Sequence, residues 1–346
     1  DVQHDHPAVL KSLRLQRSQQ ASRVKDRDAR PDAEEMRRIN DIISRPKRQI
    51  SAEEKLLLFR FRFSLPEKPG ALTKFLHAVD WKDLEERQQV TELLGKWSLV
   101  DIDDALELLG KEFRGISEVR RHAVSRLEGA SDDDLKLYLL QLVQALRYEP
   151  IVHDAVEETG VLHSPRTKQT NRSGSHQTMS NLSASAALVA EAGSQGLGGA
   201  PKCALTWFLI CRAVRCRTLA TLFHWYLLAE ADDRERGAIF DRVRQQFLEA
   251  LAETADGREI KKMIERQVAF RQQVLWCLKQ AKQSKRDRLD KKIEKFRQAL
   301  QENAHPPDLE LKLNLAGGLD VGVPLPVDPS VTLLRVLPEK SSLTKS

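Results

Sequence analysis

Residues 119–146 read VRRHAVSRLEGASDDDLKLYLLQLVQAL, and this stretch decides the fold. Its apolar residues recur at spacings of three and four on both sides of a Gly-Ala-Ser break, which is the periodicity of two consecutive helices. Ser131, followed by the acidic run Asp132, Asp133 and Asp134, is typical of a helix N-terminus, where a hydroxyl caps the chain and acidic groups face the positive end of the helix dipole. The sequence therefore predicts helices at 117–128 and at about 132–148.

Behind the predicted cap, two sets of apolar residues share the second helix. Leu135, Tyr138, Leu139, Leu142 and Leu146 form the first face, and a second face contains Leu137, Leu140 and Val143. A helix that is apolar on two sides is covered on both of them, as an inner helix of a solenoid would be. On the preceding helix, Val119, Ala123 and Leu127 mark the buried side. Arg120, Arg121 and Arg126 are then free for solvent, acidic neighbours or helix-end carbonyls.

The same stretch contains residue types that could carry chemistry. His122 and Ser125 are three residues apart, but no orienting acid or oxyanion site is indicated nearby, and a nucleophile needs both. The aspartates occupy adjacent helix positions, about 100° apart around the axis, so their carboxylates do not converge on a metal ion. We therefore predict structural roles here and no catalytic, cofactor-binding or metal-binding residue in the chain.

Outward from this stretch, the helical pattern continues in both directions. A capping box formed by Ser51 and Glu54 should start a helix that runs through Phe63, and Pro66 and Pro69 should end it. Further helices are expected at 71–79, 84–96 and 101–110, and in CALTWFLICRAV, TLATLFHWYLLAE, AIFDRVRQQFLEALAE and one long basic segment from Glu259 to about Leu300. Helices this short must pack on their neighbours. The predicted fold is mainly α, an α-solenoid of antiparallel helix pairs.

The composition suggests five segments along the chain. They are a charged connector with short helices (1–50), a first helical part (51–159), a disordered Ser/Gly-rich insertion (160–201), continuing helices (202–304) and a β segment (305–346). In the last segment, DLELKLNL alternates like a strand and PLPVDPSVTLLRVLPEKSSL looks extended, with Val331, Leu333, Leu334 and Val336 as its apolar positions. These strands are too few to close a domain.

The bulk composition is that of a soluble globular protein. The 346 residues are 41% hydrophobic and 31% charged, and only 5% are aromatic, which favours helices. The cysteines, Cys203, Cys211, Cys216 and Cys277, lack zinc-ligand spacing. No apolar run approaches the roughly 18 residues of a membrane span, and the first residues have no apolar signal core, so we expect a cytosolic or membrane-surface location.

At this point the residues show a resemblance to a known family. VRRHAVSRLEGASDDDLKLYLLQLVQALRYE resembles the signature segment of the helical accessory domain of phosphatidylinositol 3-kinases and their 4-kinase relatives, and so do ALTKFLHAVDW, ELLGKW and DIDDALELL. The polar insertion after LRYE, the segment TLATLFHWYLLAE and PLPVDPSV are similar to the class III enzymes of endosomal and autophagic membranes.

The resemblance implies an order of C2 domain, helical domain and bilobed kinase domain. This chain would be a fragment that begins after the first and ends with the first strands of an incomplete kinase N-lobe. ATP and Mg²⁺ or Mn²⁺ would serve the intact enzyme; the chain has no DFG motif, so it should hold no cofactor and be inactive alone. Implied partners are the rest of the kinase chain, a pseudokinase-type regulatory subunit, a Beclin-type subunit and the membrane surface. The implied location is cytoplasmic, peripheral on endosomal and autophagic membranes.

Two other functions compete with this hypothesis. A free-standing helical adaptor that binds proteins is compatible with a solenoid. The segment 258–297, with 14 Lys or Arg against 5 Asp or Glu, could bind nucleic acid through charge, but it lacks interleaved aromatics and a binding motif, so no nucleic-acid partner is expected. Two further interpretations of this basic segment remain open: it is a surface that binds anionic lipid or a regulatory subunit, or its charges only interact with solvent. Its candidate residues are Lys285, Arg286, Lys291 and Lys292.

Overall fold

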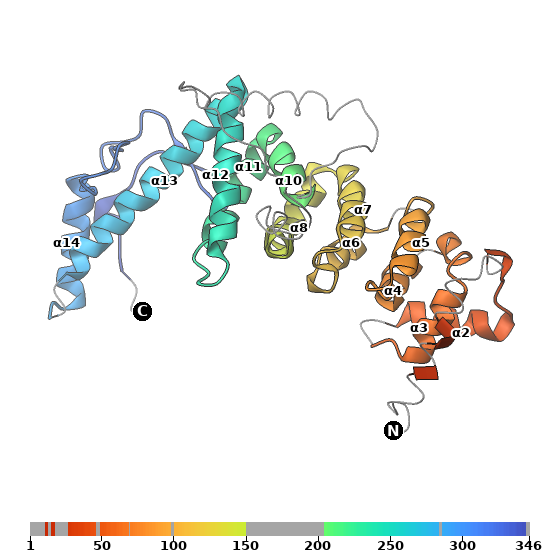
Figure 1. Cartoon of the computed structure of the whole chain (residues 1–346). Coiled ribbons are helices and arrows are strands. Elements are labelled where there is room, and N and C mark those ends of the chain that lie inside the picture. The colour runs from red at the N-terminus through yellow and green to blue at the C-terminus, as the bar shows by residue number, and fades with distance from the viewer. Residues whose placement is uncertain are drawn as a thin grey trace, which may run out of the picture. The chain divides into compact units, whose positions relative to one another are not determined.

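The computed structural model describes residues 11–12, 15–17, 27–45, 49–68, 70–97, 100–149, 204–283 and 286–343. The chain divides into two compact units. Figure 1 labels the helices of both. Unit 1 comprises residues 1–131, 148–158 and 201–205; unit 2 comprises residues 132–147, 159–200 and 206–346. The predicted insertion 160–201 lies outside the described residues.

Unit 1 is helical throughout its described part. Its elements are α2 (Ala33–Ser44), α3 (Ala52–Arg60), η2 (Leu65–Glu67), α4 (Ala71–Ala78), α5 (Leu84–Leu94), α6 (Ile102–Leu108), η3 (Lys111–Phe113) and α7 (Ser117–Glu128). Helices near each other in sequence pack together: α2 on α3, α3 on α4, α6 on α7 and α5 on α7. Buried apolar residues such as Leu58, Phe75 and Val119 fill the space between them, as short helices that cannot stand alone require.

Unit 2 contains the longer helices and the small sheet. Its elements are α8 (Asp132–Ala145), α11 (Arg217–Glu230), α12 (Gly237–Glu253), α13 (Ala255–Lys282), α14 (Leu289–Gln301), β1 (Val323–Pro324), β2 (Thr332–Leu333) and η6 (Pro338–Lys340). Two further elements, η4 (Leu146–Tyr148) and α10 (Ala204–Arg215), lie mostly in unit 2, with residues 148 and 204–205 in unit 1. Helix α11 packs on α8 and α12, α12 on α13, and α13 on α14. The strands pair antiparallel, with Val323 opposite Leu333. No helix among the described residues is long and apolar enough to cross a membrane.

The predicted capping box at Ser51 is confirmed. The Ser51 hydroxyl accepts the Glu54 amide at 3.2 Å, and the Glu54 carboxylate accepts the Ser51 amide at 2.8 Å. Helix α3 nevertheless ends at Arg60 and not at Phe63, because the chain turns through residues 61–64 to bury Phe61. A second capping box, between Asp32 and Glu35, starts α2.

Residues 119–146 form the predicted pair of helices, α7 and α8. The three aspartates occupy the first turn of α8, and Leu135, Leu139 and Leu142 are buried as predicted. The prediction of a second covered face is wrong for Leu137 and Leu140, whose exposed fractions are 73% and 38%. Among the described elements, α8 packs mainly on α11, which covers one side of it.

The predicted single helix from Glu259 to Leu300 is two helices, α13 and α14. The apolar side of α13 ends at Ala281, and the sequence that follows, KQSKRDR at 282–288, contains no apolar residue. After this break, Phe296 and Leu300 of α14 join Cys277 and Ala281 of α13 in one core cluster. The apolar residues on both sides of the break therefore share one core cluster, but they come from two helices that pack on each other.

The C-terminal β prediction is right in kind and wrong in part. A two-stranded sheet forms at the second predicted segment, which spans 324–343: β1, Val323–Pro324, begins one residue before it, and β2, Thr332–Leu333, lies inside it. The segment DLELKLNL, residues 308–315, forms no strand, although Leu313 and Leu315 are buried in the core cluster. Its alternating pattern therefore reflects burial of a non-strand segment against α13. Of the predicted apolar positions, Leu333 and Val336 pack on that cluster, whereas Val331 and Leu334 are exposed.

Candidate functional site

The predicted basic surface lies at the turn between α13 and α14. Arg286 is exposed in the turn, Lys291 is exposed on α14 and Lys292 is half-buried there, whereas Lys285 lies outside the described residues. Asp287 lies among these cations, with the Lys295 ammonium 2.6 Å and the Lys291 ammonium 3.6 Å from its carboxylate oxygens. The hydrogen bond from Lys295 lowers the pKa of Asp287. One carboxylate thus offsets part of the charge, and the function of this surface stays a prediction.

Helix α13 holds the C-terminal segment through buried glutamines. The Gln273 side chain donates to the Leu313 carbonyl at 3.0 Å and accepts the Leu313 amide at 2.8 Å, so it pairs with that residue as a neighbouring strand would. Gln267 donates to the Pro324 carbonyl at 2.8 Å and accepts the Trp225 indole N–H at 2.9 Å. Helix α13 is therefore the element that positions both the loop at 313 and strand β1.

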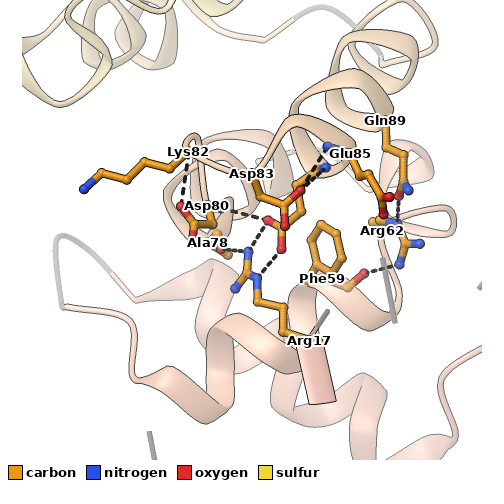
Figure 2. A network of polar contacts seen from close by, with 10 residues as sticks. Arg17, Phe59, Arg62, Ala78, Asp80, Lys82, Asp83, Glu85 and Gln89 are labelled. Carbon is orange, nitrogen blue, oxygen red and sulfur yellow. Dashed lines mark hydrogen bonds and ion pairs between the residues drawn. The ribbon is translucent and has the colours of Figure 1, made fainter. Parts of the chain in front are cut away.

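In unit 1, a polar network converges on Arg17 (Figure 2). The guanidinium donates through Nε to one Glu86 carboxylate oxygen at 2.5 Å and through Nη2 to the other at 2.7 Å. Nη2 also donates to the Ala78 carbonyl at 2.5 Å. The guanidinium carbon lies 4.7 Å from the centre of the Phe59 ring. The connector is thus anchored to the helical part by a bidentate pair, a carbonyl and a ring face.

A second arginine, Arg62, supports the same aromatic ring. It is buried, with its guanidinium 4.5 Å from the centres of both the Phe59 and Phe63 rings. It donates to the Phe59 carbonyl at 2.9 Å and to the Gln89 side chain at 2.8 Å. Figure 2 shows the Phe59 ring between the two guanidinium groups.

The sequence-based reasoning missed this network, although part of it has a local signal. Residues 59–63 read FRFRF, and alternating aromatic and guanidinium groups can stack. Arg27 continues the series, 5.8 Å from the centre of the Phe63 ring. Glu86, in contrast, is 69 residues from Arg17 and gives no local sign of its role.

His122 and Ser125 do not form a catalytic pair. The Ser125 hydroxyl donates to the backbone carbonyl of His122 at 2.8 Å and not to its ring. Burial lowers the pKa of His122. His224 on α11 is buried, and neither of its ring nitrogens has a partner among the described residues. Burial and the nearby Arg244 lower its pKa to about 4. Within the described part of the chain, no cluster of His, Cys, Asp or Glu could hold a metal ion.

Comparisons with known proteins place this arrangement in a family. Residues 27–259 match the model of the phosphoinositide 3-kinase family accessory domain (PIK domain). The chain is 34% identical over 345 residues to phosphatidylinositol 3-kinase pik3 of Schizosaccharomyces pombe, covering 99% of this chain and 36% of that protein. It is 30% identical over 356 residues to phosphatidylinositol 3-kinase VPS34 of Saccharomyces cerevisiae, covering 100% of this chain and 38% of the relative.

A third relative supports the resemblance to class III enzymes. The phosphatidylinositol 3-kinase catalytic subunit type 3 of Caenorhabditis elegans is 29% identical over 368 residues, with 99% of this chain and 38% of that protein covered. The chain thus spans between about a third and two fifths of the length of these relatives. The family model covers most of the described helices of both units, from α2 through α12. The chain therefore belongs to the phosphoinositide 3-kinase family, and residues 27–259 are its accessory (PIK) domain.

Proposed function

We propose that the chain is the helical scaffold of a phosphatidylinositol 3-kinase that transfers the γ-phosphate of ATP to the 3-hydroxyl of phosphatidylinositol. The observation that carries the proposal is the match of 99% of the chain to relatives named phosphatidylinositol 3-kinase. The scaffold role rests on the short helices packed on their neighbours and on α13, whose glutamines fix the segment that follows it.

Catalysis would depend on residues outside this chain. The sequence contains no DFG motif, and the described residues offer no carboxylate cluster for Mg²⁺ or Mn²⁺. The residues present therefore do not fit the metal that the reaction needs, and no catalytic step is assigned to them. We expect the isolated chain to form no lipid product from ATP and phosphatidylinositol.

A chimera tests the scaffold function directly. The aligned segment of the Schizosaccharomyces pombe kinase, about a third of that protein, is replaced by this chain. The chimera should phosphorylate phosphatidylinositol at the 3-position, and the same chimera carrying Leu139→Asp should not, because a charge in the α8 core disrupts the scaffold. A chimera that is folded and soluble but inactive would contradict the kinase proposal and favour the helical adaptor.

The basic turn between α13 and α14 supports a proposal of membrane contact. Arg286 and Lys291 are exposed there, and each cation near an anionic membrane contributes about 1 kcal/mol at low salt. Replacing Arg286, Lys291 and Lys292 by Ala should weaken binding to phosphatidylserine vesicles. Replacing the exposed Arg37 and Arg38 of α2 is the control. Equal binding by both variants would leave solvation as the role of the basic turn.

The partners and the location follow the class III resemblance. We propose that the intact protein works on endosomal and autophagic membranes with a pseudokinase-type and a Beclin-type regulatory subunit. Exposed helix faces, such as the one that carries Leu137, are available for such contacts. Affinity purification of the intact protein, followed by mass spectrometry and imaging of the tagged protein, tests both expectations. Absence of both subunits from the purified material would contradict the proposed assembly.

A further inference from the structure

The contacts around Arg17 have the form of a ligand-binding site. The Glu86 carboxylate, the Ala78 carbonyl and the Phe59 ring approach one guanidinium group from different elements, α5, α4 and α3. The Glu86 side chain is only 2% exposed. A carboxylate this buried requires a partner, because an unpaired buried charge is costly.

The carboxylate is held in place by groups other than Arg17. One Glu86 oxygen also accepts the Asp80 amide at 2.8 Å. The Glu86 amide donates to the side chain of Asp83, the N-cap of α5, at 3.2 Å, which fixes Glu86 in the first turn. The positive end of the helix dipole favours an anion at this position. The anionic part of the site is therefore built by α5 and the preceding loop, without help from the connector.

The aromatic part of the site is equally fixed. Phe59 is buried, and the guanidinium of Arg62, itself anchored by Gln89 and the Phe59 carbonyl, lies against its ring. In Figure 2 the side of the ring away from Arg62 faces the Arg17 guanidinium. The ring is thus a preorganised surface for one planar cation.

The described residues that precede Arg17 in the connector are exposed. Of the described residues in the range 11–17, Lys11, Ser12, Leu15 and Gln16 are exposed, and Arg17 is the one that is partly buried. Leu15 packs so little that 62% of its surface is exposed. Among the described residues 11, 12 and 15–17, the Arg17 side chain therefore makes the main contact with the helices of unit 1.

We propose that Glu86, the Ala78 carbonyl and the Phe59 ring form an arginine-binding site, filled by Arg17 of the same chain and able to accept the arginine of a partner segment instead. Selectivity for arginine follows from geometry. A guanidinium fork matches both carboxylate oxygens, reaches the carbonyl and lies over the ring, whereas an ammonium group is a single point of charge.

Chemical rescue of the 346-residue chain tests the site. Arg17→Ala should lower the melting temperature, and methylguanidinium chloride should raise it again relative to the same concentration of methylammonium chloride. The wild-type chain, whose site is full, and the double variant Arg17→Ala/Glu86→Gln, whose carboxylate is gone, are the controls. Equal effects of the two salts on Arg17→Ala would overturn the proposal. If that variant does not fold, Arg17→Gln, which also leaves the Glu86 carboxylate without a cation but keeps a polar side chain, takes its place.

Binding of a partner arginine is measured with a short peptide. Fluorescently labelled acetyl-Leu-Gln-Arg-amide, the sequence of residues 15–17, is titrated into the Arg17→Ala chain. It should bind about tenfold more tightly than the peptide in which lysine replaces arginine, and about tenfold more tightly than it binds the wild type, since preorganised bidentate pairing sets the preference. Equal binding of both peptides, or equal binding to both chains, would refute an exchangeable arginine site.

Discussion

Gln273→Leu should detach the segment around Leu313 from α13. In the native chain, the Gln273 amide satisfies both the carbonyl and the amide of Leu313, and both residues are buried. Leucine has a similar volume and no polar atoms. The substitution therefore leaves two backbone groups without partners and creates little change in packing.

The size of the effect follows from those two groups. An unsatisfied buried donor or acceptor costs about 1–3 kcal/mol, so the loss of both partners should cost about 2–6 kcal/mol of stability in unit 2. For a unit of this length, each kcal/mol corresponds to about 2–4 °C. We expect the melting temperature to fall by roughly 4–24 °C, with earlier local opening of the segment that follows α14.

Hydrogen exchange measured by mass spectrometry locates the effect, and the adjacent glutamine supplies the control. Gln272 is exposed, so Gln272→Leu should change stability by no more than about 0.5 kcal/mol. Peptides covering residues 305–320 should exchange faster in Gln273→Leu and at the native rate in Gln272→Leu. If the two variants exchange and melt alike, the paired contacts of Gln273 do not hold this segment.

Three further predictions follow from single buried or capping residues. Leu139→Asp places an unpaired charge in the α8 core and should destabilise the chain by about 3–5 kcal/mol; an unchanged thermal melt would contradict this. Ser51→Ala removes the cap of α3 and should cost about 1 kcal/mol in denaturant titration, whereas Ser51→Asp should retain the cap. His224 has a pKa of about 4 in the fold against 6.5 as the ordinary value. Its neutral form is favoured in the native state, so stability should fall as pH drops from 6.5 to 4, by up to about 3 kcal/mol, and His224→Leu should flatten that part of the profile.

The helices of the opening stretch could be predicted because their signals are local. The i, i+3, i+4 spacing and the acidic first turn put the boundaries at 117–128 and at 132, and the structure has Ser117–Glu128 and a start at Asp132. The same reasoning failed for 259–300. Helical hydrophobic periodicity is present both before and after the polar break, so the pattern does not reveal that the helix is interrupted. It also failed at 308–315, where alternation reports which residues are buried but not what they pair with. The partner of Leu313 is a side chain 40 residues away.

The candidate sites also differ in whether their residues are close together in the sequence, and this decides which of them could be predicted. The cations of the α13–α14 turn are visible in the sequence as a charge excess. The ion pairs of Asp287 with Lys291 and Lys295 were not predicted. The FRFRF run is also visible. The pairing of Arg17 with Glu86 is not, because it depends on how α3, α4 and α5 come together and on which buried carboxylate they leave in need of a cation.

Two arginine side chains donate hydrogen bonds to backbone carbonyl groups at the C-terminal ends of helices. A solenoid of short helices has many C-termini, and each leaves carbonyl groups that intrahelical bonds cannot satisfy. Arg17 donates to Ala78, the last residue of α4, and Arg120 donates at 2.6 Å to Leu109, the C-cap of α6. A cation there also complements the negative end of the helix dipole. Because each of these arginines comes from another element, it both closes one helix and fixes a second segment against it. A cationic residue in this chain can therefore determine which helices pack together. For this reason, a cluster of cationic residues in the sequence is not by itself evidence of a surface for anionic partners.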